Sequence, residues 1–219
     1  MSIRDERKQQ SRQALLEAAL TLSTSGRSFS TISLREVARE AGLVPTAFYR
    51  HFQDMDELGS DLVDQVAIGL HHLLRSLREG FEMKTPSTTR LSIERFFNAI
   101  DQSPRHWLFL IGERWGGSPV VRDAIAREIR FFIDDLAEDM KKLPAFQHVG
   151  ISQDLQVMSS ILINLSFSWG MTWLNLPEKN NAASIDEQRE QLIHSTTKQA
   201  QLMFRGISNW KSDSASQAS

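Results

Sequence analysis

The residues that could ligate a metal or transfer protons are six histidines and a run of carboxylates. None of the histidines stands in the HExxH or ExxH spacing that zinc and di-iron sites use. His71 and His72 are adjacent, so on a helix they point about 100° apart and do not share one metal face. The carboxylates Asp134, Asp135, Glu138 and Asp139 are typical of a solvated helix face. We predict no metal site.

Nucleophilic and cofactor chemistry lack their motifs as well. The chain has no cysteine, which excludes disulfides, zinc–thiolate sites, iron–sulfur clusters and thiol nucleophiles. GxSxG, GxGxxG and a phosphate-binding Gly-rich loop with Lys are absent. We therefore predict no catalytic residues, no cofactor and no enzyme activity. An alternative is a helical enzyme acting on acyl-thioesters, whose candidate groups His71, His72, His106 and Glu113 form no recognisable dyad.

Charge is distributed unevenly along the 219 residues. The whole chain carries −2, but residues 1–52 carry +3 and the remainder carries −5. A basic amino-terminal part on an acidic body indicates that the first part binds a polyanion.

One segment is apolar enough to raise the question of a membrane. Residues 155–177 contain no charged side chain, and this segment is long enough to span a bilayer. Eight of these residues are Gln, Ser, Asn or Thr, and no Lys/Arg cluster flanks them. We interpret the segment as a core or subunit-interface helix without membrane insertion. The polar, charged amino terminus is unlike a secretory signal, and we expect a cytoplasmic protein.

The elements that position these residues are predicted to be helices. Apolar residues recur every three or four positions, as in Leu58, Leu62 and Val66, and no segment alternates like a strand. Capping pairs at Ser33 with Glu36 and at Asp54 with Glu57 mark helix starts. The fold class is predicted to be all-α, with about nine helices.

The first fifty residues have the spacing of a helix-turn-helix. A helix over 33–41, a turn at Ala41-Gly42-Leu43 and a short helix over 44–52 fit that motif. Pro45, Thr46 and Tyr49 would point outward while Phe48 and Phe52 pack inward, which suits the major groove of DNA. An ordinary three-helix core with Tyr49 as a surface aromatic is the alternative.

The string SLREVAREAGLVPTAFYRHFQDMDELG resembles the DNA-binding signature of TetR-family transcriptional repressors. The resemblance is strong over residues 10–65 and weaker over 112–138. Within the family the chain is most similar to the FabR and DesT regulators of unsaturated fatty-acid synthesis.

This resemblance implies an all-helical homodimer that binds double-stranded operator DNA. It implies a helix-turn-helix domain over 1–53, an effector-binding and dimerisation domain over 54–211, and a disordered tail over 212–219. The DNA contacts carried over by the motif, together with the basic amino-terminal arm, are Ser33, Pro45, Thr46, Tyr49, His51, Arg4, Arg7, Lys8 and Arg12. Two departures are Thr46, where many members have Gly, and Met55, where many have a phosphate-binding Lys. The arm would compensate for that Lys; a solvated terminus is its alternative.

The second half is crowded with aromatic residues, since 11 of 18 lie between Phe96 and Trp173. Such a set favours a large apolar cavity for a hydrophobic effector, although a plain core is the alternative. Arginines at its mouth would bind a phosphate-bearing head group or lie on a solvated face. The predicted ligand-binding residues are Phe96, Phe97, Ile100, Trp107, Leu110, Trp115, Phe132, Leu136, Ile161, Leu165, Trp169, Arg114 and Arg130.

The uncharged segment and the last helix occupy the place where this family dimerises. Small residues at three- or four-residue spacings would allow close approach of partner helices. The predicted interface residues are Ser159, Leu162, Ser166, Gly170, Thr196 and Met203. The sequence thus predicts a repressor of fatty-acid genes that senses long-chain acyl-coenzyme A. The alternative is a TetR-type repressor of an efflux or other operon with a different hydrophobic effector.

Overall fold

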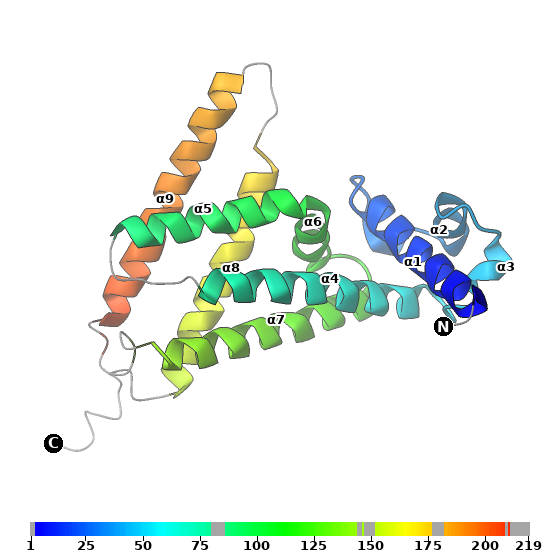
Figure 1. The fold of residues 1–219 in the computed structure, drawn as a ribbon, viewed down its shortest axis with the longest axis horizontal. Helices are drawn as coiled ribbons and strands as arrows, with labels where there is room; N and C mark the ends of the chain where they lie inside the picture. The colour runs from blue at the N-terminus through cyan, green and yellow to red at the C-terminus, as the bar shows by residue number, and fades with distance from the viewer. Residues whose placement is uncertain are drawn as a thin grey trace. The chain divides into compact units, whose positions relative to one another are not determined.

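The structure is a computed structural model that describes residues 3–79, 86–143, 146, 152–176, 182–208 and 210. Across these residues the chain forms nine α-helices and one short 3-10 helix, and no strand (Figure 1). The predicted all-α fold is confirmed.

One long helix and three short ones follow one another at the amino terminus. They are α1 (Ile3–Ser23), the 3-10 helix η1 (Phe29–Thr31), α2 (Leu34–Glu40) and α3 (Pro45–Phe48). Helix α1 packs against η1 and α2, and α2 packs against α3. Because α1 already begins at Ile3, the basic arm is part of a helix. The predicted helix over 44–52 is shorter than expected, since it ends at Phe48 and continues as a turn.

Helix α4 (Met55–Glu79) begins at the predicted capping pair. The amide of Glu57 donates to Asp54 Oδ1 at 2.9 Å, and the amide of Gln53 donates to Glu57 Oε2 at 2.5 Å. These bonds satisfy amides that the first turn would leave without partners.

The remaining helices are α5 (Pro86–Gln102), α6 (Pro104–Glu113), α7 (Pro119–Lys141), α8 (Ser152–Leu174) and α9 (Ala182–Ser208). Three of them start at a proline, whose fixed φ suits the first helical position and whose missing N–H costs nothing there. At α7 the residue before the proline caps the helix, because the amide of Val121 donates to Ser118 Oγ at 3.3 Å.

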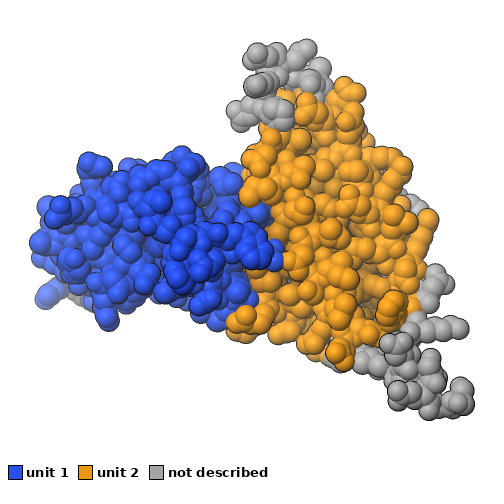
Figure 2. Space-filling view, turned by 180° about the vertical axis from the view of Figure 1, so that it is seen from behind, with its two compact units in different colours: residues 1–70, 103–128 blue, residues 71–102, 129–219 orange. Residues whose placement is uncertain are grey.

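The helices divide into two compact units, coloured separately in Figure 2. Unit 1 comprises residues 1–70 and 103–128, and unit 2 comprises residues 71–102 and 129–219. Of the three boundaries, two fall inside helices, α4 and α7, and the third lies between α5 and α6. The predicted three-helix domain lies within unit 1, which also takes in α6 and the first part of α7. This division leaves the functional boundaries at residues 53 and 211 as predictions, and the predicted tail lies outside the described residues.

Helix α8 is the one described helix that is long and apolar enough to cross a membrane, by length and composition alone. Its inward side chains nevertheless belong to the core of unit 2, including Leu155, Met158 and Phe167. Core helices of soluble proteins satisfy the same criterion, which agrees with the predicted core role.

Candidate DNA-binding face and effector pocket

The helix-turn-helix is fixed by local bonds. The amide of Glu36 donates to Ser33 Oγ at 3.3 Å, and the amide of Ser33 donates to Glu36 Oε2 at 2.9 Å, so the predicted capping box is present. Gly42 makes the turn after α2 with φ +69°, a conformation that favours glycine. Together these features set where α3 begins.

Helix α3 exposes the side chains that the sequence predicted to face DNA. Tyr49 is 65% exposed, and Pro45 and Thr46 are exposed as well, while Phe48 and Phe52 are buried. Val44 is also exposed and was not among the predicted contacts. The inward ring of Phe48 meets the edge of Tyr49 and tilts against Phe52. The outward surface is therefore short, uncharged and held by a buried aromatic anchor.

The hydroxyl of Ser33, predicted to contact a DNA phosphate, already has an acceptor within the chain. Its hydroxyl donates to Glu36 Oε2 at 2.8 Å, and Arg27 donates to Glu36 Oε1 at 2.9 Å. The bonds from Arg27 and Ser33 lower the pKa of Glu36 to about 2, so this carboxylate stays charged. A DNA phosphate that reached Ser33 would have to share the hydroxyl with that negative charge.

His51 lies among cations at the edge of this surface. Its Nε2 is 2.8 Å from Ser11 Oγ, and its Nδ1 is buried without a partner among the described residues. Burial, followed by the nearby charges of Lys8, Arg12 and Arg50, lowers its pKa. Arg50 is a residue that sequence reasoning missed. Its position directly before His51 in the motif was the available signal.

The arm cations do not form one group. Arg4, Arg7 and Lys8 are exposed on the first turns of α1. Arg12 instead forms an ion pair with Asp61 of α4, and its guanidinium lies 5.3 Å from the centre of the Phe52 ring. The prediction for Arg12 needs correction, because its charge is already engaged in tying α1 to α4.

A buried carboxylate on α6 accepts hydrogen bonds from the segment that precedes the helix-turn-helix. Glu113, at the end of α6, is only 4% exposed; its Oε1 accepts from the amide of Phe29 at 2.8 Å and its Oε2 from Ser28 Oγ at 3.2 Å. Gly116 makes room for it, since a Cβ there would lie 2.0 Å from Glu113 Oε2. Glu113 was a catalytic candidate from the sequence, and in the structure its carboxylate instead accepts a hydrogen bond from η1.

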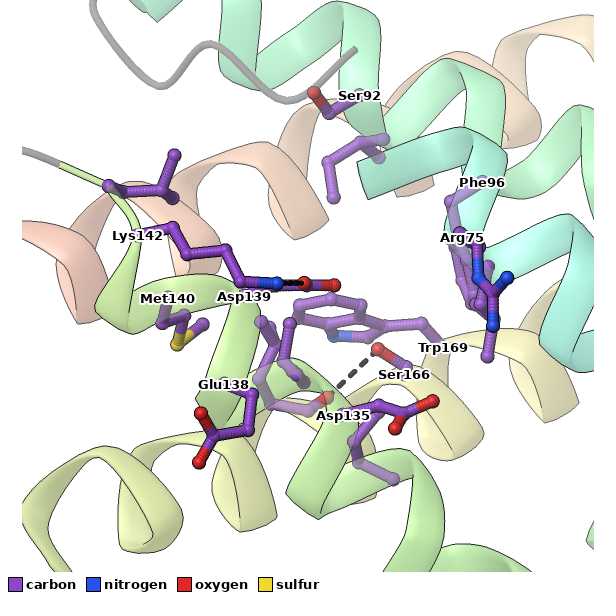
Figure 3. A pocket seen from close by; sticks show the side chains of 16 residues that line it. Arg75, Ser92, Phe96, Asp135, Glu138, Asp139, Met140, Lys142, Ser166 and Trp169 are labelled. Carbon is purple, nitrogen blue, oxygen red and sulfur yellow. Dashed lines mark hydrogen bonds and ion pairs between the residues drawn. The ribbon is translucent and has the colours of Figure 1, made fainter. Parts of the chain in front are cut away.

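Unit 2 contains a pocket of about 650 Å³ (Figure 3). Helices α4, α5, α7 and α8 all contribute to it. Of its 16 lining side chains, nine are apolar, so most of its wall would not hydrogen-bond to a ligand. The apolar lining residues are Leu74, Ile93, Phe96, Leu136, Met140, Leu143, Leu162, Ile163 and Trp169.

Three of the predicted ligand-binding residues, Phe96, Leu136 and Trp169, line this pocket. In unit 2, Ile100 and Phe132 are buried in the solid core, and Phe97 stacks on Trp173 with 4.3 Å between ring centres. Ile161 is exposed, Leu165 is half-buried away from the lining, and Arg130 is exposed. The pocket role predicted for these six residues is not supported.

Four other predicted ligand-binding residues belong to unit 1 and lie outside this pocket. Trp107 and Leu110 are buried in the core there, whereas Trp115 is 81% exposed with the guanidinium of Arg114 at 5.3 Å from its ring centre. Apolar residues on a helix indicate burial, but they do not indicate whether the side chains pack in the core of unit 1 or of unit 2.

The charged groups that line the pocket were also missed. They are two cations, Arg75 and Lys142, and three carboxylates, Asp135, Glu138 and Asp139. All three carboxylates, together with Asp134, were predicted to form a solvated helix face. No group of three or more His, Asp or Glu side chains suited to a metal is found over the described residues.

The predicted dimer stripe on α8 faces the interior of its own unit. Ser159 is fully buried, with its hydroxyl 3.6 Å from Met140 Sδ, and Gly170 is buried. Leu162 and Ser166 line the pocket. Ser159 and Gly170 therefore pack within the chain and are not free to meet a partner, whereas Leu162 and Ser166 are half-buried and their interface role stays a prediction.

On α9 the outcome is similar, because Thr196 is fully buried and Met203 is half-buried. The exposed side of α8 instead carries uncharged residues one turn apart, Val157, Ile161, Asn164 and Ser168, and α9 exposes Leu202. Because α8 is uncharged on nearly all sides, its buried and exposed faces could not be distinguished from the sequence.

A helix-turn-helix with an outward recognition surface, accompanied by helices that enclose an apolar pocket, defines the class of helix-turn-helix transcriptional regulators. A family model described as bacterial regulatory proteins, tetR family, matches residues 15–60, and one described as tetracyclin repressor-like, C-terminal domain, matches residues 87–199. The chain belongs to the TetR family of regulators.

Solved structures share the fold over nearly the whole chain. NalD, the secondary repressor of the MexAB-OprM multidrug efflux pump in Pseudomonas aeruginosa, is 22% identical, with a TM-score of 0.59 over 94% of this chain and 100% of that one. The fatty acid degradation regulator FadR from Bacillus halodurans is 9% identical, with a TM-score of 0.59 over 91% and 95%. Reduced NemR from E. coli is 17% identical, with a TM-score of 0.61 over 88% and 97%.

Proposed function

We propose that this protein is a cytoplasmic, homodimeric repressor of genes for unsaturated fatty-acid synthesis, akin to FabR and DesT, whose effector is a long-chain acyl-coenzyme A. It has no catalytic role in this proposal. The observation that carries the effector class is the 650 Å³ pocket, whose lining is mostly apolar. A long acyl chain gains about 0.8 kcal/mol for each buried methylene, so such a wall suits it.

Operator binding is assigned to the exposed surface of α3. Tyr49 with Pro45 and Thr46 would meet base edges in the major groove, while Arg7, Lys8 and Arg50 would meet phosphates. In a dimer the two recognition surfaces need a separation of about 34–36 Å, or a multiple of it, to enter successive major grooves. The exposed faces of α8 and α9 are the surfaces proposed for the partner.

Helix α4 connects the two activities in this proposal. Its first turn is capped by Asp54, directly after the helix-turn-helix, and its later turns place Leu74 and Arg75 in the pocket lining. A ligand that favours one position of α4 would shift the population of dimers whose recognition surfaces fit the operator. A coupling of about 1–3 kcal/mol between the two sites is usual for allostery.

A second candidate is a repressor of an efflux operon that responds to a cationic hydrophobic compound. The carboxylates of Asp135, Glu138 and Asp139 at the pocket favour it, and NalD, with a similar fold, is described as an efflux-pump repressor. The two candidates share the DNA-binding mechanism and differ in the sign of the ligand's charge.

The experiment is operator binding measured by fluorescence anisotropy, with a duplex selected in vitro from a random library. Tyr49→Ala should abolish specific binding without unfolding the protein. Saturated and cis-unsaturated acyl-coenzyme A of equal chain length should change operator affinity to different extents, severalfold apart, and free coenzyme A should do little. A response to a lipophilic quaternary ammonium ion, with none to either acyl-coenzyme A, would establish the second candidate instead.

A further inference from the structure

The charges around the pocket are unequally compensated. Lys142 Nζ donates to Asp139 Oδ1 at 2.9 Å, and Lys141 Nζ donates to Glu138 Oε1 at 2.5 Å. Asp135 Oδ2 lies 3.6 Å from His71 Nδ1. Each carboxylate of the lining thus has a basic neighbour within the protein, and these pairs reduce the attraction of the pocket for a cationic ligand.

Arg75 differs from these groups. It lines the pocket from α4, its side chain is exposed, and it pairs with no carboxylate over the part of the chain that the structure describes. In Figure 3 its guanidinium lies beside Phe96 and bears no dashed line to any other side chain drawn. An unpaired guanidinium beside an apolar cavity is a donor fork without an acceptor, and its geometry matches a carboxylate or phosphate.

The pocket also differs between its two ends, as a binding site for an amphiphile must. In the close-up, Arg75 lies on the opposite side from Met140, and the Trp169 indole lies between them (Figure 3). Met140 and Leu143 are apolar and belong to a cluster with Ala137, Phe146 and Met158. One end of the cavity therefore offers an unpaired cation, and the other offers Met140 and Leu143 together with the Lys142–Asp139 pair, whose charges are already compensated.

We propose that Arg75 binds the anionic head of the effector, a carboxylate or a phosphate, while the acyl chain extends past Trp169 toward Met140. This inference rests on the proposed function for the identity of the chain, and it adds the residue and the charge that orient it. Because Arg75 belongs to α4, the head group is bonded directly to the helix that continues to the helix-turn-helix. A ligand with the same chain but a neutral head would fill the cavity and leave that bond unmade.

The test compares binding of four ligands that carry the same sixteen-carbon chain. They are palmitate, palmitoyl-coenzyme A, the neutral alcohol and the quaternary ammonium ion, with affinities followed by calorimetry on the full chain. The wild-type protein should bind the anionic ligands more tightly than the alcohol, and the ammonium ion most weakly. Palmitate against palmitoyl-coenzyme A distinguishes a carboxylate head from a phosphate-bearing one.

The variant is Arg75→Gln, and Arg130→Gln is the matched control, because Arg130 is an exposed arginine of unit 2 outside the pocket lining. Arg75→Gln should weaken the anionic ligands by roughly tenfold or more, as loss of a charged hydrogen bond does, and leave the alcohol unchanged. Arg130→Gln should change none of the four. Unchanged affinity of both anions for the Arg75→Gln protein would overturn the assignment.

Failure of this inference and failure of the proposed function have different signatures. If acyl ligands alter operator affinity equally in wild type and Arg75→Gln, the function stands and the head-group role is refuted. If Arg75→Gln loses anion binding while no acyl ligand alters operator affinity in wild type, the head-group role stands and the acyl-sensing function fails. If no anionic ligand binds the wild-type protein, or the ammonium ion binds most tightly, the head-group role is refuted.

Discussion

The two units use their large side chains differently. In unit 1, Phe48, Trp107 and Phe109 are almost completely buried, and this core supports an exposed recognition surface. In unit 2, Phe96 and Trp169 border a cavity of about 650 Å³. A close-packed interior resists any change of volume, whereas side chains around a cavity can repack when it is filled. The difference suggests that the DNA-reading part is built to keep its shape and the effector part to respond.

Both units pair ions across helices, as in Arg12 with Asp61 in unit 1 and Arg90 with Glu190 in unit 2, where both terminal nitrogens of Arg90 donate to the carboxylate at 2.8 Å. Unit 1 in addition keeps Arg7, Lys8 and Arg50 exposed. Pairing within the chain stabilises an assembly of helices, while exposed cations remain available to phosphates.

The largest expected effect comes from removing a ring from the solid core. Phe48→Ala should lower the free energy of unfolding by about 3–5 kcal/mol, because it creates a new cavity. Leu162→Ala should cost no more than about 2 kcal/mol, at the low end for this change, since Leu162 already borders empty space. Urea unfolding followed by circular dichroism at fixed protein concentration measures both. Equal losses would contradict the contrast between a packed and a hollow unit.

An intermediate effect is expected at the buried carboxylate of unit 1. Glu113→Ala should cost about 1–3 kcal/mol, because the buried amide of Phe29 would lose its acceptor. Glu113→Gln keeps an acceptor oxygen for that amide and should remain close to wild type. Thermal unfolding of the two variants gives the comparison, and a Gln variant as unstable as the Ala variant would show that the negative charge itself is required.

The smallest effect concerns pH and His51. Burial and the charges of Lys8, Arg12 and Arg50 lower its pKa below the ordinary 6.5. The folded, DNA-free protein therefore holds this proton less well than the unfolded chain, so the contribution of His51 to stability is complete above pH 6.5 and declines as pH falls through its lowered pKa. A DNA phosphate beside the cluster would raise the pKa again, and operator binding would take up a proton.

Operator affinity should accordingly be two- to fivefold higher at pH 6 than at pH 8, roughly what a shift of less than one pKa unit provides. His51→Gln should remove this pH dependence in anisotropy titrations at constant salt. His106→Gln is the control, because burial lowers the pKa of His106 too, but His106 lies on α6, away from the recognition surface. A pH profile unchanged by His51→Gln would place the phosphate elsewhere.

The sequence predicted the helix-turn-helix well because the motif is local. The exposure of Tyr49 and the burial of Phe48 follow from neighbouring positions on one short helix, and the Ser33 cap depends on a residue three positions away. The shortening of α3 was not predictable, because the propensity of a few residues does not decide where a final turn ends.

The pocket was harder to predict because its wall is assembled from four helices far apart in the sequence. Aromatic content identified the right half of the chain, but Phe97 and Phe132 fill solid core while Met140 and Ile163 face the cavity. On α8 the uncharged residues extend around the helix, so the periodicity that normally marks the inner face was missing. Arg75 carried no distinctive signal, because the same helix contains a second arginine, Arg78, three positions later.

The extent of unit 1 has a consequence for protein engineering. Exchanging DNA specificities between regulators by joining them at residue 53 would leave behind α6 and the start of α7, which belong to unit 1. The recipient would then have to supply its own partner for the amide of Phe29. A chimera that transplants residues 103–128 along with the first 70, or that preserves a glutamate at position 113 and glycine at 116, would keep the hydrogen bond to Phe29. The exchangeable part of this chain therefore consists of two separate segments, and cutting the chain at one position does not transfer both.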